Sequence, residues 1–395
     1  MKLLFIHDIK AKCFGGKTYA RSYGKVIWDR YLTVFDSIKV CTRCYDATEE
    51  DVKGVDLLSC DGVAFDKRIG MFKGPEVFFS KRVRKILREN INEADAVILR
   101  LDSFLGLLTV RECRKIGKPY LIEVVGCAWD SFWHHGIDGK LLALPIFLMM
   151  KKSIHDAPFV VYVTKDFLQR RYPTKGKNTN ISNVSIPPHD DTILESRVNK
   201  IEKQRVGDNI HLYTAANVGV RYKGMHFVVQ TLALLKKQGL SNYIYHMIGE
   251  GDQTFIHSVA EKYGVSDQIV FHGAVSHSEV LRLLREECDI YVQPSLQEGL
   301  PRAVIEAMSL GVPCIGSDVA GIPELLEDRF MFNRRKNIPE QLKSLMLSMT
   351  KDVQLQQSKQ NFVIAQYYEI DKLNKRRFDF LESFKDFIEK TSIRK

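Results

Sequence analysis

The chain has 395 residues, of which 45% are hydrophobic and 27% charged, a composition typical of a globular protein and not of a disordered one. That length exceeds one ordinary domain and suits two domains of about 190 residues each. The formal net charge of +10 favours an anionic partner, such as nucleotide phosphates, a lipid diphosphate, a membrane surface or nucleic acid. A basic soluble protein without such a partner is the plain alternative.

The cysteines and the N-terminal residues indicate the cellular compartment in which the protein is expected. Of the eight cysteines, only Cys41 and Cys44 form a CxxC pair, and no second pair or His pair stands at zinc spacing. We therefore expect a reduced, cytoplasmic protein without a metal site. Residues 1–6 lead directly into a strand-like segment without the features of a signal peptide. The longest apolar run, residues 141–150, is shorter than the ~20 residues of a membrane span and contains Pro145.

The first half of the sequence alternates apolar runs with helical stretches. The apolar runs predict strands at 2–6, 38–41, 96–99, 120–125 and 159–163. This βαβ rhythm predicts a doubly wound parallel sheet.

A glycine pair, Gly15 and Gly16, follows the first predicted strand and precedes Lys17 and Thr18. The GKT sequence is not a phosphate loop, because that motif requires a glycine where Ala11 stands. A glycine pair still allows the backbone to approach a ligand closely, and a plain tight turn is the alternative.

Two segments of the first half suit the surface of an anionic membrane. The helix predicted at 81–90 is basic with one apolar face, and residues 140–152 join an apolar run to Lys151 and Lys152. The alternative is that both are ordinary amphipathic helices that pack on the sheet.

The segment 126–136 (GCAWDSFWHHG) follows the carboxyl end of a predicted strand, where α/β proteins bind ligands. Asp130 and His134 of this segment are candidates to orient an acceptor or to steady a diphosphate. Buried tryptophan rings with hydrogen-bonded histidines are the alternative.

A polar, charged segment at 191–208 follows a proline pair and predicts a linker between two domains, residues 1–190 and 209–370. The second domain opens with strands predicted at 210–214, 243–248 and 269–272. The final segment, 371–395, is helical and charged.

The most informative stretch is 292–326, VQPSLQEGLPRAVIEAMSLGVPCIGSDVAGIPELL. A strand ends here, a loop carries Glu298 and Gly299, and the following helix carries Glu306 among apolar residues. An unpaired charge in such a helix is costly, so a ligand that supplies hydroxyls would satisfy both carboxylates. A helix N-terminus beside them favours an anion. A solvated acidic face is the alternative.

The pattern PS-x-x-EG-x6-EA-x3-G-x-P followed by GIPE resembles the motif of the family 4 retaining glycosyltransferases of GT-B fold, bacterial surface-polysaccharide type. The resemblance implies that Glu298 holds hydroxyls of a donor sugar and that Glu306 holds the ribose of a nucleotide diphosphate sugar. Backbone groups of Gly299 and Leu300 would meet the sugar and the diphosphate. Pro301 stands where many relatives have Gly, which removes one N–H donor.

By the same resemblance, the loop 217–224 would bind the diphosphate. The resemblance implies an Arg and a Lys-Gly pair in this loop. Lys223 matches the lysine, while Asn217 or Val218 stands where the arginine is expected. Arg221 could replace that arginine because a guanidinium binds phosphate bidentately. Two cations suit a metal-independent enzyme, and the sequence has no Asp-x-Asp.

The resemblance assigns the remaining contacts less specifically. Many relatives carry a histidine where Val125 stands. Backbone groups would meet the nucleotide base at Gly273, Ala274 and Val275, and the first loop would face the donor diphosphate and the acceptor at Gly15 and Gly16.

The expected fold is α/β and GT-B, with two Rossmann-like domains facing a cleft and a C-terminal helix at 371–395 that crosses back to the first domain. The expected function is retaining, metal-independent transfer of a sugar from a nucleotide diphosphate sugar to a hydroxyl acceptor, such as a lipid-linked saccharide of cell-surface polysaccharide. No cofactor and no nucleic acid are expected, and the protein is expected in the cytoplasm, peripheral at the inner membrane face. The alternatives are a GT-B nucleotide-sugar epimerase, or a non-catalytic sugar-nucleotide or nucleic-acid binding protein.

Overall fold

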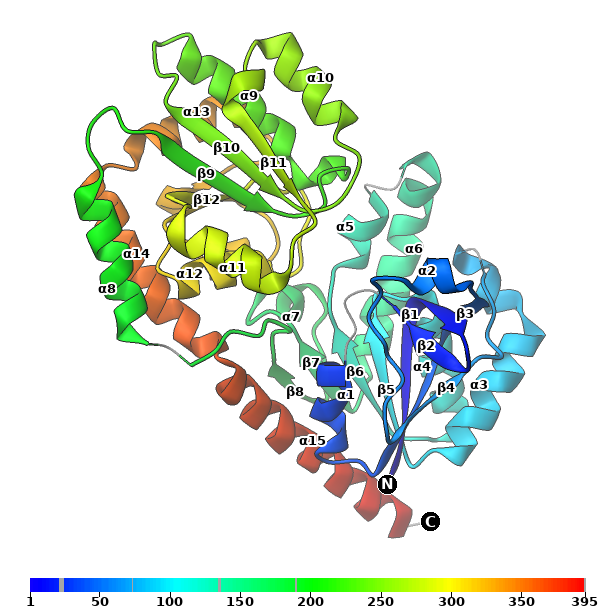
Figure 1. Cartoon of the computed structure of the whole chain (residues 1–395). Helices are drawn as coiled ribbons and strands as arrows, with labels where there is room; N and C mark the ends of the chain where they lie inside the picture. Colours follow the sequence, from blue (N-terminus) through cyan, green and yellow to red (C-terminus); the bar gives the residue numbers. More distant parts are fainter. Residues whose placement is uncertain (21–24, 73, 134–135, 189, 394–395) are drawn as a thin grey trace. The chain divides into compact units, whose positions relative to one another are not determined.

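The computed structural model describes residues 1–20, 25–72, 74–133, 136–188 and 190–393 (Figure 1). The chain divides into two compact units. Unit 1 comprises Met1–Ile181 and Asn374–Lys395, and unit 2 comprises Ser182–Leu373. Each unit is built on its own parallel sheet, which confirms the predicted α/β class.

The sheet of unit 1 has the strand order β4-β3-β1-β5-β6-β7-β8, and all these pairs are parallel. Its strands are β1 (Lys2–Phe14), β2 (Lys17–Tyr19), β3 (Ser37–Asp46), β4 (Val63–Asp66), β5 (Ala96–Leu101), β6 (Tyr120–Val124), β7 (Phe159–Tyr162) and β8 (Lys177–Asn180). Strand β2 is antiparallel to β1. The order of strands along the chain reverses between β1 and β5.

Two of the helices of unit 1, α3 and α4, begin at serine N-caps and bury apolar side chains. Ser80 and Ser103 cap α3 and α4, and Val83, Ile86 and Leu87 of α3 are buried. The helical segments are α1 (Lys25–Leu32), α2 (Glu49–Val52), η1 (Gly74–Phe79), α3 (Lys81–Glu93), α4 (Phe104–Ile116), α5 (Ala128–Trp133), α6 (Gly136–His155) and α7 (Phe167–Arg171).

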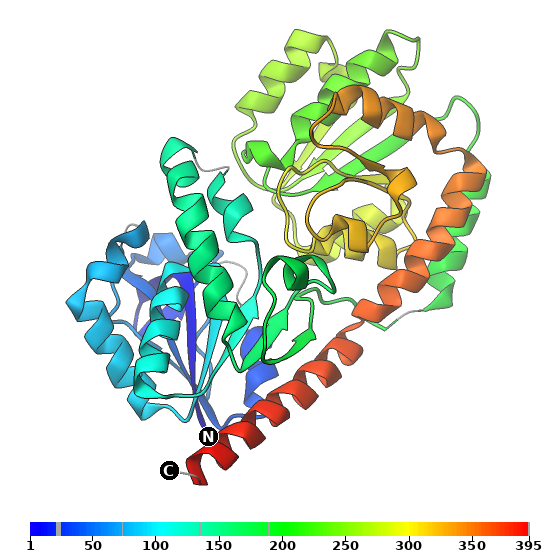
Figure 2. The same ribbon diagram turned by 180° about the vertical axis from the view of Figure 1, so that it is seen from behind.

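Helix α15 (Ile370–Ile393) contributes its C-terminal part to unit 1 (Figures 1 and 2). The ring of Phe159 in β7 contacts three phenylalanines of α15, with ring centroids 5.2–5.5 Å apart: Phe380, Phe384 and Phe387. Lys177 of β8 donates a hydrogen bond to Ser383 at 2.8 Å. These contacts attach the last helix to strands near the edge of the first sheet.

The sheet of unit 2 has the parallel order β11-β10-β9-β12-β13-β14. Its strands are β9 (Ile210–Ala215), β10 (Tyr243–Ile248), β11 (Ile269–Gly273), β12 (Ile290–Gln293), β13 (Cys314–Ser317) and β14 (Met331–Phe332). One face carries the apolar core, with Leu212, Tyr245 and Met247 packed against α9 and α13.

The helical segments of unit 2 lie on both faces of its sheet (Figure 1). They are α8 (Asp191–Lys203), η2 (Arg221–Lys223), α9 (Met225–Lys236), α10 (Thr254–Tyr263), η3 (Ser266–Gln268), α11 (His277–Glu286), α12 (Arg302–Ser309), η4 (Ile322–Glu324), η5 (Asp328–Phe330), α13 (Ile338–Ser348), α14 (Lys351–Ala365) and η6 (Gln366–Tyr368). Within the described residues, no helix combines the length and apolarity that crossing a membrane requires.

The segment predicted as a linker, 191–208, differs from the prediction. Most of it forms α8, an integral helix of unit 2. The reason is Arg197, whose buried guanidinium donates to the backbone oxygens of Leu284, Cys288 and Leu310. This charged segment resembled a linker because the partners of Arg197 lie 87 to 113 positions away in the sequence.

Candidate active site

The central cluster lies at the carboxyl ends of β9 and β12. These two strands are adjacent, although β10 and β11 separate them in the sequence. In doubly wound sheets such a reversal opens a crevice at the carboxyl ends, where ligands bind. The loop after β9 contains Lys223, and the loop after β12 contains Glu298.

The two loops are held together by backbone contacts. The N–H of Leu296 donates to the carbonyl oxygen of Tyr222 at 2.7 Å. Gly224 adopts φ +75°, and a Cβ atom there would lie 2.0 Å from the carbonyl oxygen of Pro294. Glycine is therefore required after Lys223 because any side chain would push the two loops apart.

This arrangement brings the ammonium of Lys223 to 2.7 Å from Oε1 of Glu298. Nε2 of Gln293 donates to the same oxygen at 2.8 Å, and the hydroxyl of Tyr291 donates to Oε1 of Gln293 at 3.1 Å. The side chain of Glu298 is only 10% exposed. A fixed carboxylate beside a fixed ammonium can bind hydroxyls and phosphate in one place.

Glu306 lies in α12, and His277 at the start of α11 lies beside it. Nε2 of His277 and Oε1 of Glu306 are 3.2 Å apart. This hydrogen bond raises the pKa of His277 above its ordinary value. Sequence analysis missed His277 as a partner because the two residues are 29 positions apart.

The GIPE segment supports the loop between the two carboxylates. The N–H of Gly321 donates to the carbonyl oxygen of Gly299 at 2.9 Å. A Cβ atom at Gly321 would lie 2.6 Å from that oxygen, so the close contact needs glycine. Leu300 is 8% exposed, and Pro301 precedes α12 with no N–H to offer.

The other residues that were predicted to bind the nucleotide sugar donor follow neighbouring strands of unit 2. Oδ1 of Asn217, after β9, accepts the N–H of Gly219 at 3.0 Å. Gly273 ends β11, and its carbonyl accepts the N–H of Gly249 at 2.8 Å; Ala274 and Val275 continue from it. The strands thus bring these residues to one edge of the sheet, as expected for the carboxyl ends of parallel strands.

Arg221 lies in η2 beside Lys223. Its guanidinium carbon lies 4.4 Å from the centroid of the Phe255 ring. Burial, with the charge of Arg221, lowers the pKa of His226 to about 4. His226 is therefore neutral at pH 7, and the positive charge of this loop comes from Arg221 and Lys223.

The glycine pair of unit 1 is placed differently from the expected loop. Strand β1 continues to Phe14, and Gly15 and Gly16, at φ +55° and +78°, form the turn between β1 and β2. Lys67 donates to the carbonyl of Gly16 at 3.3 Å. The two glycines therefore form a tight turn, which was the alternative interpretation of the sequence.

The predicted acceptor residues lie in the segment after β6. Asp130 is 8% exposed in α5, near Arg171 and Cys127. His134 lies outside the described residues.

A carboxyl cluster that sequence analysis missed lies where the strand order of unit 1 reverses. Asp8 follows the last residues of β1 that pair with β5, and Asp102 follows β5. Oδ2 of Asp8 accepts the N–H of Leu105 at 3.3 Å, and Nη2 of Arg43 donates to the backbone oxygen of Asp8 at 2.8 Å. Burial, with a smaller contribution from Asp102, raises the pKa of Asp8.

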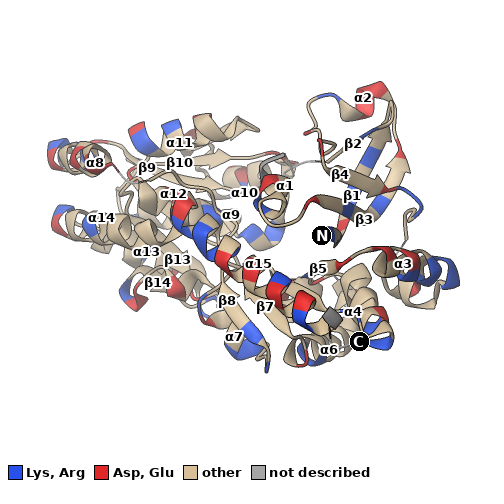
Figure 3. Cartoon of the chain, turned by 90° about the horizontal axis from the view of Figure 1, so that it is seen from below, with Lys and Arg blue, Asp and Glu red and all other residues tan. Residues whose placement is uncertain are grey.

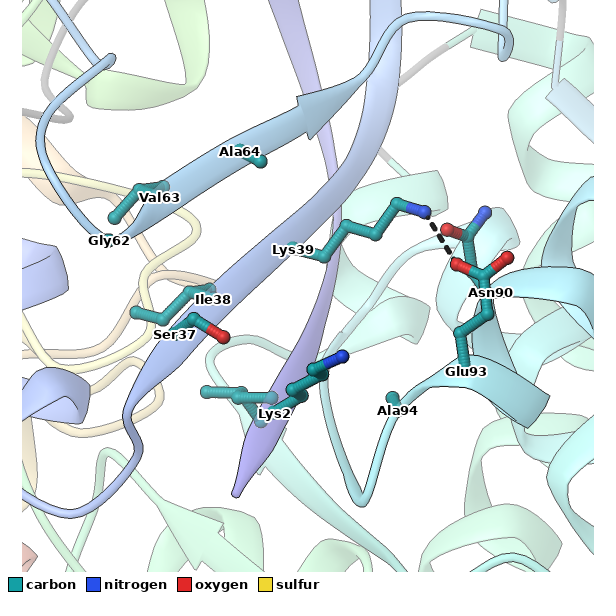
Figure 4. A pocket seen from close by; sticks show the side chains of 11 residues that line it. Lys2, Ser37, Ile38, Lys39, Gly62, Val63, Ala64, Asn90, Glu93 and Ala94 are labelled. Atoms are coloured by element: carbon teal, nitrogen blue, oxygen red, sulfur yellow. Dashed lines mark hydrogen bonds and ion pairs between the residues drawn. The ribbon is translucent and has the colours of Figure 1, made fainter.

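A separate pocket of about 750 Å³ lies at the amino ends of β1, β3 and β4 (Figure 4). Lys39 and Glu93 form an ion pair of 2.9 Å across it. Parallel α/β sheets bind ligands at the opposite ends of their strands, so this pocket is not part of the cluster described above. Within the described residues no group of three His, Cys, Asp or Glu side chains could hold a metal ion.

Solved structures show that the fold is shared. The structure of HepE from Anabaena in complex with UDP and glucose aligns with 97% of this chain and 100% of that chain, at a TM-score of 0.65 and 16% identity. The two parallel-sheet units thus form a GT-B fold.

Sequence comparisons show the family. The profile described as "Glycosyl transferases group 1" matches residues 196–365, which include both carboxylates and the Lys223 loop. The amylovoran biosynthesis glycosyltransferase AmsK of Erwinia amylovora is 34% identical over 112 residues, 27% of each chain. Protein CapJ of Staphylococcus aureus is 32% identical over 337 residues, which cover 84% of this chain and 82% of CapJ. The chain therefore belongs to the glycosyl transferases of group 1.

Proposed function

We propose that the protein transfers a sugar from a nucleotide diphosphate sugar to a hydroxyl of an acceptor and retains the configuration at the anomeric carbon. The observation that carries this proposal is the contact between Lys223 and Glu298 at the point where the strand order of unit 2 reverses. The carboxylate suits sugar hydroxyls, and the ammonium suits the diphosphate. HepE, whose fold is similar, was solved with UDP and glucose, which favours such a donor.

In the proposed reaction, the bond between the anomeric carbon and the diphosphate oxygen breaks while the bond to the acceptor oxygen forms. Lys223 and Arg221 stabilise the negative charge that develops on the leaving diphosphate. The acceptor proton passes to an oxygen of that diphosphate, so no protein nucleophile is needed. Glu298 holds the sugar, and Glu306 with His277 holds the ribose.

On the acceptor side, we assign the hydroxyl-binding groups to Asp8 and Asp102 of unit 1. They lie at the reversal of the strand order, and Oδ1 of Asp8 is buried without a hydrogen-bond partner. A hydroxyl donor from a ligand would satisfy that oxygen. Asp130, near Arg171, remains a second candidate of the same unit.

The test is a panel of nucleotide diphosphate sugars that includes UDP-glucose. We expect the true donor to raise the melting temperature, because a ligand that binds only the folded state stabilises it. With that donor alone, NMR should show slow hydrolysis that first releases the anomer present in the donor, unchanged by EDTA. The opposite anomer would contradict retention, and an epimerised nucleotide sugar would favour the epimerase. Failure of every nucleotide sugar to bind would refute the proposal.

We further propose that the acceptor is a lipid-linked saccharide for surface polysaccharide, met at the cytoplasmic membrane face. The name of AmsK, which is similar over 112 residues, refers to biosynthesis of a polysaccharide. Helix α6 exposes an apolar stripe, with Leu141, Leu144 and Leu148 each more than half exposed. Lysines lie next to it at both ends, and α3 presents Lys and Arg on its exposed face (Figure 3). The apolar face of α3 is buried, so of these two helices α6 offers the apolar contact.

Replacing the three leucines of α6 with glutamine is expected to weaken binding to anionic lipid vesicles by at least tenfold, since each inserted leucine contributes roughly 1 kcal/mol or more. Co-sedimentation with vesicles of mixed anionic and neutral lipid measures this. Leu347→Gln with Val363→Gln is the matched control, because both side chains are exposed on unit 2. Equal recovery of the wild-type protein in the supernatant with and without vesicles would contradict membrane binding.

A further inference from the structure

Three histidines form a hydrogen-bonded row across neighbouring strands of unit 2. Nδ1 of His211 in β9 lies 2.9 Å from Nε2 of His246 in β10. Nδ1 of His246 lies 3.0 Å from Nε2 of His272 in β11. The ring of Tyr213 stacks on His246 with centroids 4.3 Å apart and planes 3° apart. The row is thus a fixed arrangement on the face opposite the apolar core.

The chemistry of this row limits the number of protons it can hold. Each N···N contact requires one proton between its two nitrogens, so in the neutral row His246 donates from one nitrogen and accepts at the other. One extra proton fits only at an outer nitrogen of His211 or His272. A second proton would place two N–H groups against each other and break a contact.

Charged side chains near the row also shift the pKa values of its histidines. Helix α11 and the residues after it present Glu279, Arg282, Glu287 and Asp289 to it. Burial, with the charges of the two neighbouring histidines, nevertheless lowers the pKa of His246 to about 4. Burial also lowers the pKa of His272.

The row lies beside strand ends of the candidate active site. His272 directly precedes Gly273, whose carbonyl accepts the N–H of Gly249, and His246 lies three residues before Gly249. The sheet pairs Ile248 with Gly273 at this point. Breaking the row therefore acts on the contact that holds the end of β11 to β10.

We propose that His211, His246 and His272 form a proton-operated latch: the row with at most one extra proton keeps β10 and β11 joined, and uptake of a second extra proton in mildly acidic solution breaks a contact and lets the end of β11 open. This inference concerns the folding of unit 2 and does not depend on the proposed function. If Gly273 meets the nucleotide, as that function implies, acid also weakens nucleotide binding.

The sign of the pH dependence follows from the lowered pKa. Between pH 6.5 and 4 the closed row binds fewer protons than the open one, so closure is strongest above pH 6.5 and weakens as the pH falls. For His246 alone, the opening equilibrium should increase about tenfold from pH 7.5 to 5.5.

Hydrogen exchange, corrected for the intrinsic rate at each pH, tests this on amides of β10 and β11. In the wild type we expect the opening equilibrium to be about tenfold larger at pH 5.5 than at pH 7.5. In His246→Gln, whose side chain keeps a donor and an acceptor, we expect this increase to be less than about threefold. His257→Gln is the matched control because His257 is exposed in α10 of the same unit, and its pH dependence should match the wild type. A pH-independent wild type, or an undiminished response in His246→Gln, would overturn the latch.

A second measurement keeps the inference testable if His246→Gln does not fold. Long-range proton–nitrogen spectra of histidine-labelled wild type should show His246 neutral at pH 6, with one nitrogen protonated. Detection of a doubly protonated His246 at pH 6 would refute the proposal. If the wild-type protein did not bind UDP at pH 7.5, that result would count against the proposed function alone. The inference about the three histidines would not be affected.

Discussion

Lys223→Ala is expected to reduce kcat for turnover of the donor by about 100- to 1000-fold, the usual effect of removing one group that stabilises developing charge. The ammonium of Lys223 is fixed by Glu298 and by the glycine that follows it, so it needs no rearrangement to meet a diphosphate. The measurement is steady-state hydrolysis of the nucleotide sugar that binds best, with the donor Kd determined separately. A larger effect on kcat than on Kd would show that the charge acts mainly in the transition state.

Lys343→Ala is the matched control for this variant. Lys343 also belongs to unit 2 and forms an ion pair with Glu340, and its side chain is 17% exposed against 22% for Lys223. Its replacement should leave kcat within about twofold, since Lys343 lies in α13 and not in the loops after β9 and β12 that carry the candidate site. Equal losses in the two variants would indicate a general effect of stability. Unchanged turnover in both Lys223→Ala and Glu298→Ala would show that the central assignment is wrong.

Arg197→Met is expected to destabilise unit 2 by about 3 kcal/mol. The side chain of Arg197 is 3% exposed, and its guanidinium donates to the backbone oxygens of Leu284, Arg285, Cys288 and Leu310. Those oxygens stay buried when the donor is removed, and each unsatisfied group costs about 1 kcal/mol or more. Lys200 also donates to Cys288, at 2.9 Å, which limits the loss.

The measurement must distinguish the two units. All three tryptophans, Trp28, Trp129 and Trp133, belong to unit 1, so tryptophan fluorescence reports the unfolding of that unit. Hydrogen exchange of α11 reports unit 2 in the same urea series. We expect a lower midpoint for α11 and an unchanged midpoint for fluorescence. Arg285→Met, an exposed neighbour, is the control, and a midpoint for Arg197→Met equal to that control would contradict the account.

The strands and the donor motif could be predicted from local patterns. Apolar runs such as 96–99 and 120–125 report burial on both faces of a parallel sheet, and β5 and β6 form there. The order of Glu298, Gly299 and Glu306 likewise predicted a loop followed by a helix, and α12 begins after that loop. These features depend on neighbours within about ten residues, which the sequence shows directly.

Other features depended on contacts between distant residues. The linker prediction failed at α8 because the partners of Arg197 lie in α11 and after α12. The hairpin at Gly15 formed because β1 continues past its first apolar residues to pair with β3. The carboxyl cluster of Asp8 and Asp102 was missed because three strands, β2, β3 and β4, separate β1 from β5 in the sequence.

The sequence by itself determined the α/β class, the two-unit organisation and the motif that carries Glu298 and Glu306. The tertiary structure decided which of those residues meet. Lys223 and Glu298 are 75 positions apart, and their 2.7 Å contact exists because β9 and β12 are adjacent in the sheet. Strand order and register arise from packing of the whole unit, so no local pattern could have paired the ammonium with that carboxylate.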